Sequence, residues 1–92
     1  MLRTIRALPI FKRDVKKLRK KRFNLARLQD AVTALFEGDG PTLVRLRDHA
    51  LKGSWKGYRE LHIDADWLLI YQVERDKLEL VLVRSGSHDD LL

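Results

Sequence analysis

Residues 67–85 read WLLIYQVERDKLELVLVRS, two apolar runs separated by a short polar turn. The runs 67–74 and 77–85 are rich in Leu, Ile and Val, which favour strands, and Arg75-Asp76 between them is typical of a tight turn. Both runs are apolar at most positions and not only at alternate ones, which is typical of strands covered on both faces. We therefore expect an antiparallel pair at the centre of a sheet.

The rest of the sheet is predicted on either side of this pair. Residues 55–62 form a further strand pattern, and Asp64-Ala65-Asp66 is a turn candidate, so the three strands should make an antiparallel meander. Residues 2–8 indicate a short strand near the start of the chain. Residues 38–54 combine turn formers and charges without a sustained period, and we expect mostly loop there.

Two helices are predicted between the first strand and the meander. Pro9 suits the first turn of a helix, and Phe11, Val15 and Leu18 follow with the spacing of one helical face. A second helix begins after Asn24, a good N-cap, and ends at Gly38. Its apolar stripe comprises Leu25, Leu28, Val32, Leu35 and Phe36. The short connection predicts an α+β fold, β-α-α-β-β-β, with an antiparallel sheet packed against an N-terminal helical hairpin.

Length and composition indicate one small globular unit. The chain has 92 residues, of which 45% are hydrophobic and 35% charged, so we expect a single domain over residues 1–92. There is no cysteine, which excludes a disulfide scaffold, a thiolate zinc site and a cysteine nucleophile. The longest strictly apolar run spans residues 67–71, so we expect no membrane crossing and a cytoplasmic protein.

The positive charge is concentrated near the start of the chain. Residues 1–23 contain ten Lys or Arg and one acid, whereas residues 24–92 contain nine Lys or Arg and twelve acids. Most of the excess lies in residues 12–22, namely Lys12, Arg13, Lys16, Lys17, Arg19, Lys20, Lys21 and Arg22. Such a block attracts nucleic acid by neutralising phosphates, although a solvated helix face that keeps the protein soluble has the same composition.

Three histidines lie at predicted loops or strand ends: His49, His62 and His88. Their separations of thirteen and twenty-six residues match no local metal-ligand motif, so we expect neither a metal nor another cofactor. Imidazole has a pKa near neutral pH, so these side chains could instead transfer protons when RNA is cut by its own 2′-hydroxyl: one from the 2′-hydroxyl and one to the leaving 5′-oxygen. Arg84 would stabilise the phosphorane. Purely structural roles for the histidines remain open at this point.

Three motifs carry a resemblance to a known family. Residues 48–62 read D-H-x-L-x-G-S-W-x-G-Y-R-x-x-H, residues 66–71 read DWLLIY, and residues 84–88 read RSGSH. Together they closely resemble the YafQ-type branch of the RelE/ParE toxin superfamily. The resemblance implies the toxin of a bacterial type II toxin–antitoxin pair, a RelE-like endoribonuclease that cuts mRNA in the ribosomal A site. It further implies metal-independent cleavage that leaves a cyclic phosphate and a 5′-hydroxyl.

The resemblance also implies roles for individual residues. The active-site set falls on His49, His62, Asp66, Arg84 and His88, with nucleotide contacts by Trp67, Lys56 and Leu92. Trp67 could equally be a core aromatic, and Leu92 stands where the family has an aromatic residue. The eight basic residues at positions 12–22 would contact ribosomal RNA. The implied partners are the ribosome, mRNA and a DNA-binding antitoxin with an acidic toxin-binding segment.

Two other functions remain as alternatives. A ParE-like toxin would keep the fold but inhibit gyrase, and it would have no need of a proton-transfer set. A non-catalytic RNA-binding module would use the basic helix and leave the histidines incidental. Substitution of His88 separates both alternatives from a nuclease.

Overall fold

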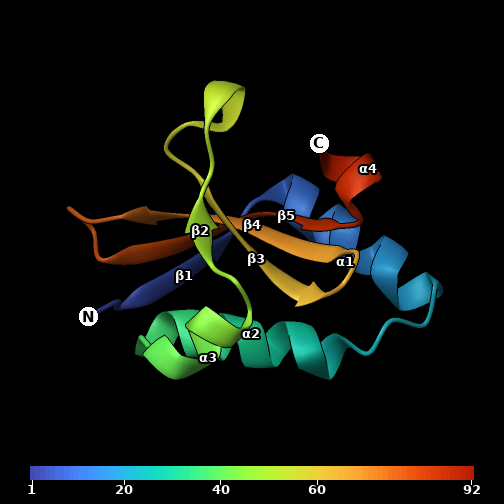
Figure 1. The fold of residues 1–92 in the computed structure, drawn as a ribbon, viewed down its shortest axis with the longest axis horizontal. Helices are drawn as coiled ribbons and strands as arrows, with labels where there is room; N and C mark the ends of the chain where they lie inside the picture. Colours follow the sequence, from blue (N-terminus) through green and yellow to red (C-terminus); the bar gives the residue numbers. More distant parts are fainter.

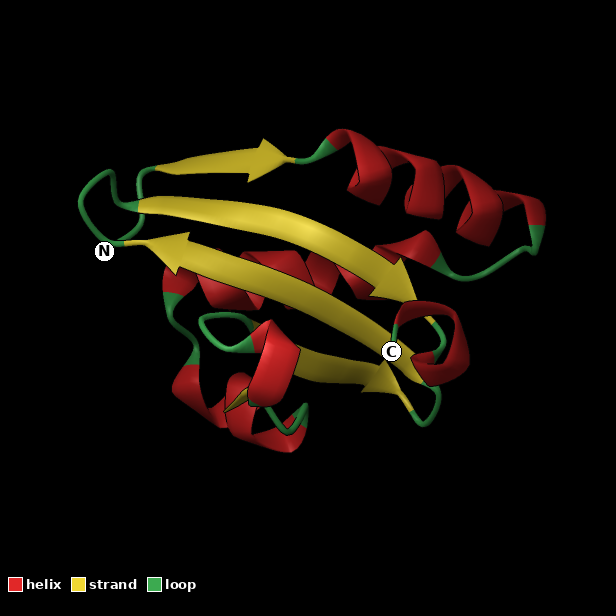
Figure 2. Ribbon diagram, turned by 90° about the horizontal axis from the view of Figure 1, so that it is seen from above, coloured by secondary structure: helices red, strands yellow, loops and turns green.

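Five strands form one twisted sheet in the computed structural model, which describes residues 1–92. The strands are β1 (Thr4–Ala7), β2 (His49–Ala50), β3 (Arg59–Asp64), β4 (Trp67–Glu74) and β5 (Glu79–Gly86). Their order is β1-β5-β4-β3-β2, so β4 and β5 lie centrally, as predicted (Figure 2). The predicted meander of β3, β4 and β5 is confirmed, since both of its pairings are antiparallel.

The pairing of β1 corrects the prediction of a wholly antiparallel sheet. β1 lies parallel to β5, with Thr4 opposite Glu79 and Ala7 opposite Leu82. A parallel pair needs a long crossover connection, and everything between residues 8 and 78 supplies it here. A strand prediction made from local pattern gives no information about this direction.

Helices α1 (Pro9–Lys20) and α2 (Leu25–Glu37) follow β1 and begin close to the predicted residues. Pro9 stands in the first turn of α1, and the Asn24 side chain accepts a hydrogen bond of 3.1 Å from the backbone N–H of Ala26. Gly38 ends α2 in the left-handed conformation with φ 69°, which glycine adopts at little cost. The chain reverses direction between the two helices, and they contact the sheet differently. α2 lies below it (Figure 1), whereas α1 runs along the end of β5 beyond short β1 (Figure 2).

The segment expected to be mostly loop contains two short elements. Helix α3 (Gly40–Arg45) is capped by Asp39, whose side chain accepts a hydrogen bond of 3.3 Å from the backbone N–H of Thr42. β2 pairs with β3 and adds a further edge to the sheet. The strand predicted at 55–62 starts only at Arg59, because a 3₁₀ turn at 53–55 and the left-handed Gly57 interrupt the extended chain. A final helix, α4 (His88–Leu91), was also not predicted.

Apolar side chains form a core on each face of the sheet. The larger core joins the two long helices to the sheet and contains Phe11, Leu18, Leu28, Ala31, Leu35, Leu61, Ile63, Trp67, Leu69, Tyr71, Leu80 and Leu82. The smaller core, on the opposite face, contains Leu68, Ile70, Val81, Val83 and Leu91, with Leu51, Trp55 and Tyr58 packed against it. No helix has the length and apolar character needed to cross a membrane.

Candidate functional site

Two histidines and a buried carboxylate meet where β2 pairs with β3. His49 stands directly opposite Glu60 in this pairing, and His62 lies two residues after Glu60, hence on the same face. Oε1 of Glu60 lies 3.5 Å from Nε2 of His49 and 3.6 Å from Nε2 of His62. The imidazole rings are stacked, with centroids 6.0 Å apart and an interplanar angle of 23°.

The surroundings of this trio favour a neutral His62. Burial lowers the pKa of His62, and the positive charge of Arg47 lowers it further, whereas Glu60 acts in the opposite direction. The charges of His49 and His88 also lower the pKa of His62. Leu68 of β4 is paired with His62 on one side and with Gly86 on the other, so α4, which begins at His88, starts at the same end of the sheet as His62. A neutral imidazole has a lone pair for a proton, so His62 is suited to act as a general base.

Glu60 is anchored by burial more than by hydrogen bonds. Its side chain is 6% exposed, and its second oxygen, Oε2, has no hydrogen-bond partner. Nδ1 of His62 is likewise buried and without a partner. Buried polar atoms without partners are uncommon in folded proteins and are typical of functional sites.

A polar cluster holds the segment that carries His49. Arg59 donates hydrogen bonds to Asp48 at 2.9 Å and to the hydroxyl of Tyr71 at 3.1 Å, and that hydroxyl donates to Asp48. Nδ1 of His49 lies 2.7 Å from the carbonyl oxygen of Arg47, which can only accept a hydrogen bond. This contact places the proton on Nδ1 and directs Nε2 toward Glu60.

Arg84 lies on the same row of the sheet as Glu60. Ile70 of β4 is paired with Glu60 on one side and with Arg84 on the other, which separates their Cα atoms by roughly 10 Å. Nε and Nη2 of Arg84 donate to the two oxygens of Asp14 in α1, at 2.8 and 3.0 Å. The backbone N–H of Ser85 also donates to Asp14, at 3.0 Å. The hydrogen bond to Asp14 raises the pKa of Arg84, so its charge is permanent.

His88 begins α4, where β5 ends. Ser87 caps this helix by accepting a hydrogen bond of 3.2 Å from the backbone N–H of Asp90. The backbone N–H of His88 donates to Oδ1 of Asp66 at 3.2 Å, which ties α4 to the turn between β3 and β4. Asp66 therefore contacts the backbone of His88 and not its imidazole, and the imidazole itself is exposed.

Trp67 does not take the base-stacking role implied by the resemblance. The residue is 4% exposed, and its indole Nε1 donates a hydrogen bond of 3.0 Å to the hydroxyl of Ser85. Phe23 packs edge-on against the indole, with ring centroids 4.9 Å apart. Trp67 is thus a core aromatic, the alternative that the sequence left open. The other two residues with an implied nucleotide contact, Lys56 and Leu92, are exposed.

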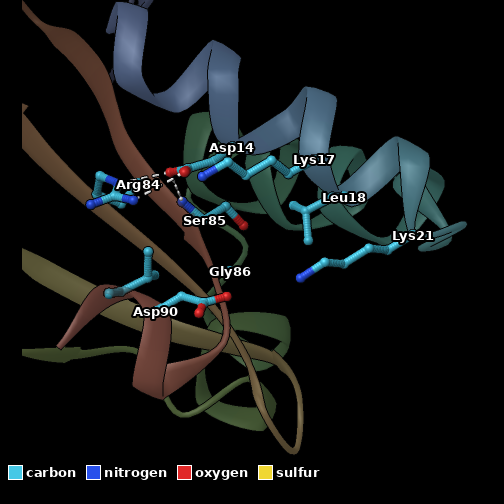
Figure 3. Close-up of a pocket in the computed structure, with 9 residues that line it drawn as sticks. Asp14, Lys17, Leu18, Lys21, Arg84, Ser85, Gly86 and Asp90 are labelled. Atoms are coloured by element: carbon cyan, nitrogen blue, oxygen red, sulfur yellow. Dashed lines mark hydrogen bonds and ion pairs between the residues drawn. The ribbon is translucent and has the colours of Figure 1, made fainter.

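Six of the eight basic side chains at positions 12–22 line two separate hollows. Lys17 and Lys21 line a cleft of about 380 Å³ together with Arg84 and Asp90 (Figure 3). Lys12, Arg13, Lys16 and Arg19 line a separate groove on another side of the helix. All eight basic residues at positions 12–22 are exposed and available to an anionic partner.

Sequence reasoning missed two acidic residues of this site, Glu60 and Asp14. Glu60 was detectable, because in a strand it shares a face with His62. Asp14 is the only acid among residues 1–23, and it stands three residues after Phe11 and four before Leu18, which places it on the apolar face of α1 and was the available signal. Both are buried.

The trio could also hold a metal ion, against the expectation drawn from sequence spacing. One ligand atom from each of His49, Glu60 and His62 lies within 4.8 Å of the others. Sequence spacing does not reveal this cluster, because its members come from two paired strands and not from one local motif. Imidazole nitrogens with one carboxylate oxygen suit zinc or copper better than magnesium.

Comparison with known proteins gives consistent matches over nearly the whole chain. The family model described as "Bacterial toxin of type II toxin-antitoxin system, YafQ" matches residues 3–92. The mRNA interferase toxin YafQ of Escherichia coli (strain K12) is 40% identical over 78 residues, which cover 85% of this chain and 83% of that protein.

Two solved structures match the fold as closely. A chain in the crystal structure of the E. coli DinJ-YafQ toxin-antitoxin complex has a TM-score of 0.87 and 36% identity, covering 100% of this chain and 99% of that one. The crystal structure of a metal-bound toxin from Helicobacter pylori has a TM-score of 0.88 and 40% identity, with 100% of both chains covered.

Proposed function

Because the chain belongs to the YafQ family of bacterial type II toxin–antitoxin toxins, we propose that it is an mRNA interferase, a toxin that inhibits translation by cutting messenger RNA. Residues 1–92 act as one toxin domain in the bacterial cytoplasm and cut the codon in the ribosomal A site. The observation that carries the proposal is the group of His49, His62 and Arg84 at one end of the sheet, where α4 begins with His88.

The chemistry uses these side chains and the 2′-hydroxyl of the RNA. His62 accepts the 2′-hydroxyl proton while the 2′-oxygen attacks the adjacent phosphorus. The bond from phosphorus to the 5′-oxygen breaks, and His88, in its protonated form, donates a proton to that oxygen. A 2′,3′-cyclic phosphate and a 5′-hydroxyl result. Arg84 stabilises the charge on the phosphorane, for which Nη1 remains after Nε and Nη2 have bonded to Asp14.

The remaining site residues position this set. Glu60 contacts both His49 and His62 and orients their rings, while His49 adds a further imidazole near the 2′-oxygen. Asp66 fixes the first residue of α4 and so places His88. Lys56 and Leu92 contact the message at the exposed margins of the site.

The partners follow from the family and the charge. The relative in the E. coli complex assembles with the antitoxin DinJ, and this toxin binds an antitoxin of the same kind, acidic in its toxin-binding segment and DNA-binding elsewhere. The basic side chains of α1 that point away from the cleft contact ribosomal RNA, and that binding weakens as salt concentration rises.

Primer extension on a defined mRNA tests the proposal, with and without translating ribosomes. We expect cuts within A-site codons only when ribosomes are present, and we expect His88→Ala to abolish them while ribosome binding is retained. Asp76→Ala is the matched control, because Asp76 is an exposed residue of the turn between β4 and β5, at the opposite end of the sheet from His88. This control should cut as well as the unaltered protein.

An intact message would contradict the proposal. If the protein then blocks DNA supercoiling by gyrase, the ParE-like alternative holds. If it binds RNA without cutting, and His88→Ala remains fully toxic, the protein is a binding module.

A further inference from the structure

A basic cleft lies beside the proposed reaction centre and is not used by the proton-transfer residues. α1 forms one wall, and the end of β5 with α4 forms the other (Figure 3). Lys17 lies in the last turn of α1, and Lys21 is the residue that caps the end of the helix. They are four residues apart, and the backbone N–H of Lys21 donates a hydrogen bond of 3.1 Å to the carbonyl of Lys17, so they lie on the same side of the helix. Figure 3 shows both side chains extending from α1 toward β5.

Arg84 lines the β5 wall of this cleft and is held in place by Asp14. Two of its nitrogens are bonded to the Asp14 carboxylate, which is buried, so the guanidinium has little freedom to turn. Asp14 balances one positive charge, and Asp90 is the other acid that lines the cleft. Two ammonium groups and a free edge of guanidinium thus face the space with one unpaired carboxylate among them.

The position of the cleft favours an RNA phosphate as its ligand. Arg84 stands four residues before His88, which begins α4, and Asp90 and Leu91 of the same helix line the cleft. An RNA strand whose scissile phosphate contacts Arg84 continues past α4 or along α1, the helices that line the cleft. Because each nucleotide carries a phosphate, the next phosphate of that strand lies close to the cleft. A free phosphate or an acidic side chain could satisfy the same cations, but neither is continuous with the reacting group.

We propose that Lys17 and Lys21, which line the same cleft as Arg84, form a subsite for the backbone phosphate next to the scissile phosphate that Arg84 contacts. This inference rests on the proposed function and divides the basic helix, since Lys17 and Lys21 bind the message while the other cations of α1 contact the ribosome. The subsite sets the register of the RNA relative to His62 and His88.

The test pairs a protein change with the removal of one phosphate charge. In each test message, an uncharged methylphosphonate replaces the phosphate at one linkage near the cut. The nucleotide before this linkage is a 2′-deoxynucleotide, which keeps the modified linkage stable. Reference messages carry the same deoxynucleotide with an ordinary phosphate. Single-turnover cleavage on programmed ribosomes is measured for the unaltered protein and for the double variant Lys17→Gln, Lys21→Gln.

We expect the double variant alone, or the methylphosphonate alone, to lower kcat/KM about tenfold. At the linkage that the subsite contacts, the two changes together should lower kcat/KM no further, because the effects of removing two groups that contact each other are not additive. Lys12→Gln with Lys16→Gln is the matched control, with the same residues, spacing and charge change on another side of α1. Its loss, caused by weaker ribosome binding, should be equal on the charged and uncharged messages. Thermal unfolding followed by circular dichroism verifies that both double variants fold.

Three results would overturn the inference. Equal loss by Lys17→Gln, Lys21→Gln on every message would assign the cleft to ribosomal RNA. Undiminished cleavage combined with lost neutralisation by the antitoxin would assign it to an acidic segment of that protein. Undiminished cleavage with neutralisation intact would leave the cleft without a binding role. Failure of the proposed function is distinguishable from all of these, because the unaltered protein would then cut no message.

Discussion

Replacement of Asp14 tests whether a buried ion pair holds α1 against the sheet. The Asp14 carboxylate accepts hydrogen bonds from Nε and Nη2 of Arg84, at 2.8 and 3.0 Å, and from the N–H of Ser85, at 3.0 Å. Its side chain is 6% exposed and that of Arg84 is 22% exposed. Asp14→Ala leaves the guanidinium and the N–H without an acceptor in a site that is largely closed to water.

The expected loss follows from this geometry. Removing one partner of a buried ion pair costs about 3–5 kcal/mol, because the other charge is left uncompensated. Arg84 keeps some contact with water, so we expect the lower end, about 3 kcal/mol. For a domain of this size, 1 kcal/mol corresponds to about 4–8 °C, and the midpoint of thermal unfolding should fall by about 12–24 °C.

Equilibrium unfolding in urea measures this loss, followed by circular dichroism and by tryptophan fluorescence. Asp30→Ala is the matched control, since Asp30 is an exposed aspartate on α2 and its loss should change stability by less than about 0.5 kcal/mol. The double variant Asp14→Ala, Arg84→Met should recover much of the stability, because the uncompensated charge is then absent. A single Asp14→Ala variant within about 1 kcal/mol of the unaltered protein would refute the reasoning.

Three further predictions concern the site and its surroundings. Burial lowers the pKa of His62 below its ordinary value of 6.5, so its contribution to stability is complete above that pH and is lost as the pH falls through the lower folded value. Urea midpoints measured from neutral to mildly acidic pH should fall less steeply for His62→Gln than for the unaltered protein. Trp67→Phe loses the hydrogen bond to Ser85 and should cost about 1–2 kcal/mol in urea unfolding, yet leave the cut sites unchanged; altered codon choice would mean that the indole contacts a base. Cleavage on ribosomes should persist with a chelator that removes zinc and copper but leaves the Mg²⁺ that ribosomes need. Added Zn²⁺ should inhibit cleavage by occupying His49, Glu60 and His62, and Glu60→Gln should require more Zn²⁺ for the same inhibition in a titration.

The parts of the fold that were predictable are those with a long local pattern. β4 and β5 are apolar at most positions over eight residues each, whereas α1 and α2 repeat the apolar period of a helix over twelve and thirteen residues, and tertiary packing reinforces both patterns. α3, β2 and α4 are too short for a period, and their existence depends on caps and partners. β2 has two residues and exists because it pairs with β3.

The site divides in the same way. His49, His62, Arg84 and His88 could be named from residue type and motif, since imidazoles and guanidinium groups have few chemical roles at element ends. Their partners could not, because Asp14 and Arg84 are 70 residues apart and meet only when α1 docks beside β5. The contact between Glu60 and His49 likewise depends on a strand register that no local pattern specifies.

The insertion of β5 between β1 and β4 has a consequence for how the toxin is made. β5 is the only neighbour of β1 in the sheet. β1 is the first strand to be synthesised, and it can pair only after nearly the whole chain has left the ribosome. Asp14 also lacks its partners until then, because Arg84 and Ser85 belong to β5. A chain that ends before β5 therefore has an incomplete sheet and lacks Arg84, so prematurely terminated products should be inert. The cell is thereby exposed to cleavage only by chains that have been synthesised past β5.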